Sequence, residues 1–157
     1  MTARFLWVFF ISLLPLVELR GAIPVSQAFT PPLPLFPAYV VAIVGNMVPV
    51  PFIYLFARRF LEWGARTKML HSFCTFFLTK GKAAGDRLTA TAGRGFFIAL
   101  ALFVAIPLPG TGAWTGTLGA SFLGMRFKET VCAVITGVLI AGSIMAAVSA
   151  GVFSIIR

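Results

Sequence analysis

Apolar residues run along this chain in short stretches that proline and glycine interrupt. Residues 5–14 form a run broken only by Ser12, and Pro15 follows it. Residues 21–29 form a second run, which ends in the sequence Thr-Pro-Pro-Leu-Pro at 30–34. Crossing a bilayer takes about 20 apolar residues, so neither run is long enough to cross alone. We therefore predict a re-entrant helical hairpin with its break at residues 14–24.

A longer apolar segment follows at residues 36–57, which we expect to span the membrane. Pro37 suits its first helical turn, and Pro49 and Pro51 predict a bend. Asn46 is a polar side chain at membrane depth. Two readings of it stay open, namely a hydrogen bond between helices and a contact to substrate or ion.

The second half of the chain repeats this plan. Residues 96–106 are a short apolar run, residues 107–114 read Pro-Leu-Pro-Gly-Thr-Gly-Ala-Trp, and residues 115–125 form another short run. Residues 130–156 are long enough to span, with small residues at four-residue spacing that allow close helix packing. Each half would cross the membrane once in net, so the second half must be inverted relative to the first. Broken segments at matching positions of inverted repeats indicate a transporter's binding site.

The expected fold is therefore an all-α integral membrane protein with a single membrane domain. Two inverted repeats each consist of a re-entrant helical hairpin and one transmembrane helix. Repeat one covers residues 5–57, a basic linker covers 58–94, and repeat two covers 95–157. Within the linker, apolar residues at helical spacing predict an amphipathic helix on the membrane surface: Met69, Leu70, Phe73, Phe76 and Phe77.

Composition supports a membrane protein, because 59% of the residues are hydrophobic and only 11% are charged. Soluble domains carry about 25% charged residues. The N-terminal run could pass for a signal peptide, but no clean cleavage site follows it, and we expect it to belong to the mature chain. Cys74 and Cys132 lack metal-ligand spacing and read as packing thiols.

The net charge of +9 has a distribution that indicates topology. Apart from Arg4, Arg20 and Arg157, all the basic residues fall in the linker and in the short charged segment that begins at Arg126. The positive-inside rule then places the linker in the cytoplasm and both termini outside, in a prokaryotic inner membrane. We expect contact with membrane lipids and no binding of nucleic acid.

Glu18 and Arg20 are the ionisable residues of the first break. Ionisable residues inside a membrane are functional candidates by default. Glu18 could load and release a proton, and Arg20 offers a planar donor fork for a phosphate or carboxylate. The alternative is that the two side chains only hold the hairpin together.

The second break offers neutral groups. Its glycines permit close backbone approach, Thr111 brings a hydroxyl, and a helix that starts near Ala113 would present free amides to an anion. Trp114 could stack on a substrate or seal the hairpin. The candidate residues for substrate or proton binding are Glu18, Arg20, Gly21, Asn46, Pro107, Gly110, Thr111, Gly112 and Trp114.

These segments resemble a known family. The sequence at 14–24 (Leu-Pro-Leu-Val-Glu-Leu-Arg-Gly-Ala-Ile-Pro), Gly45-Asn46 with Pro49-Val-Pro51, and the sequence at 106–116 together look like the putative small multi-drug export protein family. The resemblance implies efflux. The paired hairpins are more distantly similar to the DedA and VTT membrane proteins, some of which are implicated in returning a polyprenyl-phosphate carrier lipid across the inner membrane.

Three classes of function follow. The first is a small secondary transporter, proton-coupled through Glu18, that exports organic compounds or translocates a lipid phosphate bound by an uncompensated Arg20. The second is a structural membrane protein. The third, an enzyme, is not expected, because the chain has one histidine, His71, and no catalytic triad or metal set; we expect no metal and no cofactor. One spanning helix per half is little to enclose a pathway, so we expect a homodimer.

Overall fold

The computed structural model describes residues 2–15, 17–67, 71–72, 74–75, 79, 93–108 and 110–156. This part of the chain is helical and contains no strand. The principal helices are α1 (Thr2–Leu13), α2 (Glu18–Ala28), α3 (Leu35–Met47), α4 (Pro49–Gly64), α6 (Gly93–Ala105), α7 (Ala113–Phe122) and α8 (Phe127–Ile156). Most of the predicted amphipathic surface helix lies outside the described residues, including Met69, Leu70, Phe73, Phe76 and Phe77.

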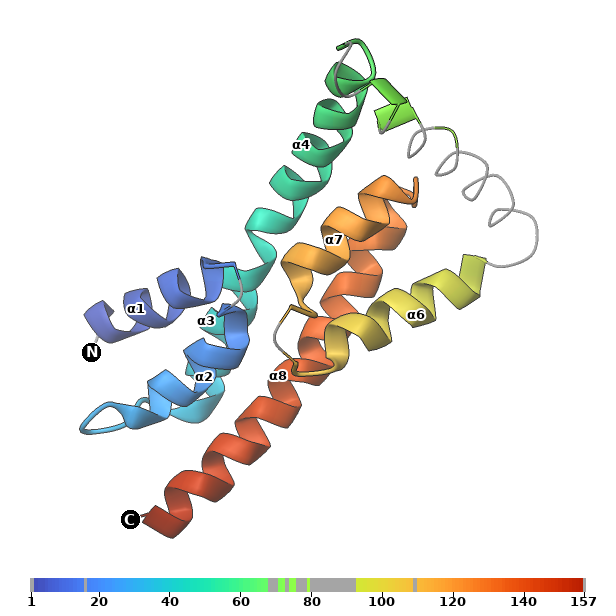
Figure 1. The fold of residues 1–157 in the computed structure, drawn as a ribbon. Coiled ribbons are helices and arrows are strands. Elements are labelled where there is room, and N and C mark those ends of the chain that lie inside the picture. Colours follow the sequence, from blue (N-terminus) through green and yellow to red (C-terminus); the bar gives the residue numbers. More distant parts are fainter. Residues whose placement is uncertain are drawn as a thin grey trace.

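Two long apolar segments dominate the fold (Figure 1). Leu35–Gly64, formed by α3 and α4, and Phe127–Ile155, in α8, are each long and apolar enough to cross a membrane. The bend predicted in the first of them is present, since α3 ends at Met47 and α4 begins at Pro49. Both segments are longer than the sequence predicted, by seven residues at the end of α4 and by three at the start of α8.

The two long segments run antiparallel, as two hydrogen bonds show. The hydroxyl of Tyr39, near the start of α3, donates to the carbonyl of Leu139 at 3.1 Å. The hydroxyl of Tyr54, in α4, donates to the carbonyl of Met125 at 2.5 Å. Residue numbers rise along one segment while they fall along the other, so the two segments have opposite directions.

Each long segment carries a pair of short helices. Helix α1 packs on α3, and α6 packs on α8. The second helix of each pair reaches across, since α2 contacts both α3 and α8, and α7 contacts both α4 and α8. In Figure 1 the tips of the two pairs, at the α1–α2 and α6–α7 breaks, meet near the middle of the molecule.

Small residues of α8 are used inside the chain. Ala133 and Ala141 are fully buried. A Cβ on Gly137 would lie 2.6 Å from the carbonyl oxygen of Ala101 and from the Cβ of Val104 in α6. The glycine therefore allows α6 and α8 to pack at close range. At least this row of small residues serves packing within one chain.

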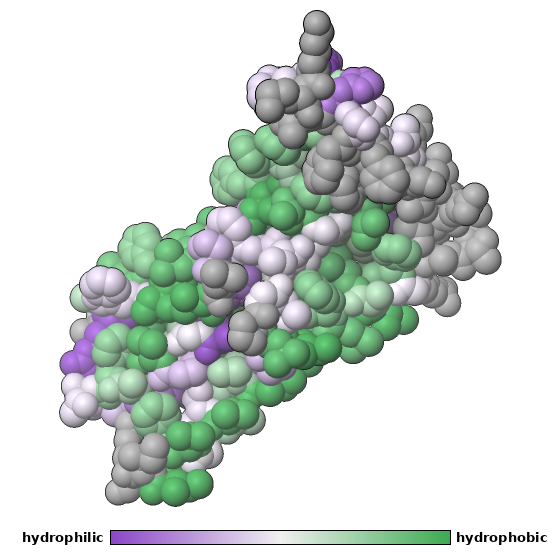
Figure 2. Space-filling view, in the orientation of Figure 1, coloured by the Kyte–Doolittle hydropathy of each residue, from purple (hydrophilic) through white to green (hydrophobic). Residues whose placement is uncertain are grey.

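Large apolar side chains remain on the surface, including Phe36, Phe52 and Phe56, which are mostly exposed. Figure 2 shows hydrophobic residues over much of one face, with hydrophilic residues gathered towards its two ends and in a central patch. Soluble monomers rarely expose apolar surface on this scale. Together with the two long helices, this surface is that of a membrane protein.

One boundary differs from the prediction and changes the first break. Helix α2 begins at Glu18, three residues before the expected apolar run, so Arg20 and Gly21 are helical rather than unwound. Pro24 lies inside this helix. A proline removes one backbone hydrogen bond, and the burial of Leu19 and Ile23 on the same helix offsets that loss. The start of α7 at Ala113 agrees with the prediction.

Candidate functional site at the junction of the two hairpins

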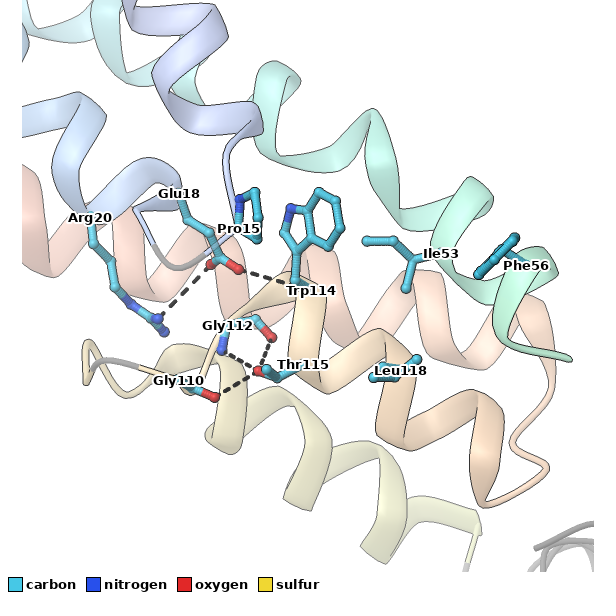
Figure 3. A pocket seen from close by; sticks show the side chains of 10 residues that line it. All are labelled: Pro15, Glu18, Arg20, Ile53, Phe56, Gly110, Gly112, Trp114, Thr115 and Leu118. Carbon is cyan, nitrogen blue, oxygen red and sulfur yellow. Dashed lines mark hydrogen bonds and ion pairs between the residues drawn. The ribbon is translucent and has the colours of Figure 1, made fainter. Parts of the chain in front are cut away.

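Glu18 connects the first break to the start of α7 (Figure 3). Its carboxylate accepts hydrogen bonds from the backbone amides of Ala113, at 3.2 Å, and Trp114, at 3.1 Å. The first amides of a helix have no partner within the helix, and negative charge is favoured there. Gly112, the residue before α7, has no side chain to cap it. Glu18 therefore supplies the N-terminal cap of a helix about 95 residues further along the chain.

Arg20 acts in the same way at the end of α6. Its Nη2 donates to the carbonyls of Ile106, at 2.9 Å, Val104, at 3.2 Å, and Thr111. Positive charge is favoured at a helix C-terminus, where carbonyls lack partners. Its Nη1 also lies 3.9 Å from the Glu18 carboxylate. The expectation of an uncompensated arginine is therefore wrong for this structure, because the start of α2 places Glu18 and Arg20 side by side.

Trp114 caps a helix end in the opposite direction, from the second hairpin to the first. Its indole N–H donates to the carbonyl of Leu13, the last residue of α1, at 3.2 Å. Of the two roles left open for Trp114, this contact supports sealing of the hairpins. Three helix ends at the two breaks are thus capped from the other hairpin, so backbone groups that have no partner within their own helix are hydrogen-bonded.

Within the second break, two threonines organise the backbone. Thr111 donates through its hydroxyl to the carbonyls of Ile106, at 2.8 Å, or Leu108, at 2.9 Å. Thr115 accepts from the amide of Gly112 at 3.0 Å and lies 2.8 Å from the carbonyl of Gly110. The amides of Ala113 and Trp114 are held in place beside Glu18 by this local network.

The backbone of Glu18 is unusual. Its φ is 52°, the left-handed region that a residue with a side chain rarely adopts. This conformation costs about 1–2 kcal/mol. The side chain is almost fully buried, with 3% of the residue exposed. The two hydrogen bonds that its carboxylate accepts from backbone amides, together with the nearby guanidinium, offset both the backbone strain and the cost of removing the carboxylate from water.

A pocket of about 280 Å³ lies at this junction. Its lining comes from both hairpins and from α4: Pro15, Glu18, Arg20, Ile53, Phe56, Gly110, Gly112, Trp114, Thr115 and Leu118. Figure 3 shows Glu18 and Arg20 at one end of it and the apolar side chains of Ile53, Phe56 and Leu118 at the other. The pocket therefore joins a charged end to an apolar end.

The structure brings most of the predicted site residues together. Glu18, Arg20, Gly110, Gly112 and Trp114 line the pocket, and Thr111 contacts Arg20 from the second break.

Like Thr111, three further predicted residues are not part of the lining. Gly21 gives room to Val17, since a Cβ there would overlap that side chain. Pro107 follows the end of α6. Asn46 is fully buried in α3, and neither polar atom of its amide has a hydrogen-bond partner within the described part of the chain.

Sequence reasoning missed five lining residues. Thr115 carried a signal, because a hydroxyl three residues after a glycine that precedes a helix can bond back to that glycine's amide. Pro15 belongs to the break but was read only as a helix breaker. Ile53, Phe56 and Leu118 had no signal, because they do not differ from the many other apolar residues of their segments.

No cluster of three or more His, Cys, Asp or Glu residues that could hold a metal ion occurs among the described residues. The functional groups of the site are a carboxylate, a guanidinium, the first backbone amides of α7 and an apolar wall.

The helices and the junction define an all-helical membrane protein whose two short hairpins meet at a charged pocket. The chain belongs to the putative small multi-drug export protein family, whose model matches residues 18–144. Comparison with curated proteins and with solved structures finds no match.

Proposed function

We propose that this chain is a proton-coupled exporter of small lipophilic compounds, with its substrate site in the pocket between the two hairpin tips. The observation that carries the proposal is the double role of Glu18. Its carboxylate lines the pocket and at the same time holds the first amides of α7. A single protonation there would change both the charge of the pocket and the contact between the hairpins.

The proton step follows from hydrogen-bond chemistry. An ionised carboxylate accepts several hydrogen bonds, whereas a protonated one becomes partly a donor. Protonation of Glu18 would therefore weaken its bonds to Ala113 and Trp114 and its attraction to Arg20. The tips would separate more readily, which is the kind of change that alternating access needs.

The architecture supports inverted repeats and re-entrant hairpins. The four short helices have 10 to 13 residues, about half of what a span needs. The long segments run in opposite directions. The packing is also reciprocal, since α1 on α3 corresponds to α6 on α8, and α2 on α8 corresponds to α7 on α4.

The substrate class follows from the pocket's wall. Phe56 is 73% exposed and Leu118 is 39% exposed, so the apolar end faces the membrane interior in our topology. A compound dissolved in the bilayer could enter sideways there. Such a compound would meet the Glu18 and Arg20 side chains at the inner end of the pocket, in agreement with the export function that the family name suggests.

Translocation of a lipid phosphate is the weaker alternative. It needs a guanidinium free to bind an anion, whereas Arg20 already donates to three carbonyls and lies beside Glu18. A homodimer also stays a proposal. Gly137 and its neighbours pack within the chain, so a dimer would use another face, which a mass measurement in mild detergent would test.

Transport by the purified chain in liposomes tests the proposal, with ethidium as the probe and an imposed pH gradient. We expect gradient-driven ethidium movement for the unchanged chain and its loss in Glu18→Gln, which cannot change charge. Glu62→Gln is the matched control, because Glu62 is an exposed acid of α4. Gradient-driven transport that persists in a folded Glu18→Gln variant would exclude proton coupling through this residue.

A further inference from the structure

A second groove lies between α6 and α7, the two helices of the second hairpin. Its volume is about 270 Å³, and its wall is almost entirely hydrocarbon. Phe96, Leu100 and Phe103 contribute from α6, and Gly119, Leu123 and Met125 contribute from α7 and the turn that follows it. No role in the proposed transport step accounts for this groove.

The groove exists because the two helices diverge. Near the tip they touch, since a Cβ on Gly116 would lie 2.7 Å from the side chain of Val104. One turn later they have separated, since a Cβ on Gly119 would meet nothing within 4 Å. Figure 1 shows α6 and α7 spreading apart from their common tip. The recess therefore widens towards the α7–α8 turn.

Basic residues follow directly at that wide end. Met125, which lines the groove, is followed by Arg126, and Lys128 lies two residues further on. The side chain of Arg126 is 67% exposed, and its ion pair with Glu129, at 3.8 Å, is also exposed. Such a pair is weak and leaves the guanidinium free to meet another anion. Lys128 is exposed as well.

We propose that this groove binds an anionic phospholipid, with one acyl chain between α6 and α7 and the phosphate at Arg126 and Lys128. The hydrocarbon wall matches the acyl chain, and the two cations match the headgroup. Anionic lipid is favoured over neutral lipid because the cations lie at the open end of the groove, where a headgroup must sit if its chain points towards the tip.

The end of the acyl chain would reach the transport site. Thr115 lines both the groove and the pocket of the hairpin junction. Its hydroxyl accepts a hydrogen bond from the amide of Gly112. Gly112 directly precedes Ala113 and Trp114, whose amides donate to Glu18. A bound lipid would therefore contact Thr115, which also lines the transport pocket.

Native mass spectrometry of the delipidated protein tests the proposal, with phosphatidylglycerol and phosphatidylcholine of identical acyl chains as the two probes. We expect preferential binding of phosphatidylglycerol. The double variant Arg126→Gln with Lys128→Gln should bind phosphatidylglycerol roughly tenfold more weakly, and its binding of phosphatidylcholine should be unchanged. Gly119→Leu should weaken the binding of both lipids, because its side chain would fill the groove.

Two matched controls accompany these variants. Arg58→Gln removes an arginine from a similarly exposed ion pair on α4, and Gly151→Leu adds a side chain at another open glycine, in α8. Both should bind lipid like the unchanged chain. Equal binding of the two lipids, or unchanged binding by the Arg126 and Lys128 double variant, would overturn the proposal. Because these two residues are exposed, the double variant should remain folded and decides the question even if Gly119→Leu does not fold.

Discussion

Gly112 lies directly against Glu18 of the other hairpin. A Cβ there would overlap the carboxylate of Glu18. Gly112→Ala should therefore displace Glu18 from the amides of Ala113 and Trp114. Each hydrogen bond to a charged group contributes about 1.5–3 kcal/mol, so we expect a clear fall in the thermal unfolding midpoint in detergent.

Gly119→Ala is the control for this change, because the same substitution seven residues further along, within α7, meets nothing within 4 Å. It should leave the midpoint unchanged or raise it slightly, since alanine favours a helix interior by about 0.5–1 kcal/mol over glycine. If both variants unfold at the same temperature, the contact between Gly112 and Glu18 does not stabilise the protein.

Trp114 offers a second test of the capped helix ends. Trp114→Phe keeps an aromatic ring but removes the N–H that donates to Leu13. Loss of one neutral hydrogen bond should cost about 1 kcal/mol. Chemical or thermal unfolding followed by circular dichroism would measure it. Trp7→Phe, at an exposed position of α1, should cost less, and an equal cost for both would argue against a capping role for Trp114.

At the scale of elements, α7 packs against both α4 and α8 and buries two polar side chains that differ in their hydrogen bonding. Ser121 donates to the carbonyl of Tyr54 in α4 at 3.1 Å. Thr117, one turn earlier, is fully buried, and its hydroxyl has no partner among the described residues. A buried polar group without a partner costs free energy that an apolar group of the same shape avoids.

Thr117→Val should therefore leave the free energy of unfolding unchanged or raise it by up to about 1 kcal/mol, whereas Ser121→Ala should lower it by about 1 kcal/mol. Unfolding measured for both variants in the same detergent gives the comparison. A marked loss of stability in Thr117→Val would mean that this hydroxyl binds a partner, such as an ordered water, at the α4–α7–α8 interface.

The elements were largely predictable because proline and glycine mark their ends. Pro15, Pro49 and the glycines of the second break each stand at a helix boundary that the sequence placed within a few residues. The partners across the junction were not predictable. Whether Glu18 contacts substrate or the start of α7 depends on how two helices about 95 residues apart in the sequence pack against each other. The local pattern of apolar and polar residues contains no information on such long-range packing.

At the scale of the whole molecule, the remaining question is how the chain lies in the membrane. The described basic residues Arg58, Arg59, Arg126 and Lys128 lie around the end of α4 and the α7–α8 turn, and Tyr54 joins these regions through Met125. The ends of the chain lie at the other end of the two long segments (Figure 1). The positive-inside rule then predicts a cytoplasmic basic end and external termini.

Labelling of single cysteines by an impermeant maleimide in intact cells tests this topology, in a background without Cys74 and Cys132. Thr2→Cys and Ser154→Cys should react from outside, whereas Arg59→Cys should react only after the membrane is opened. Leu14→Cys, at the tip of the first hairpin, distinguishes a re-entrant hairpin from two full spans. At a tip that stops within the membrane it should react far more slowly than Arg59→Cys once the membrane is opened, because lipid and protein shield it from water. A rate equal to that of Arg59→Cys would mean that the first hairpin crosses completely, and the two short helices would then have to span the bilayer with about half the usual length.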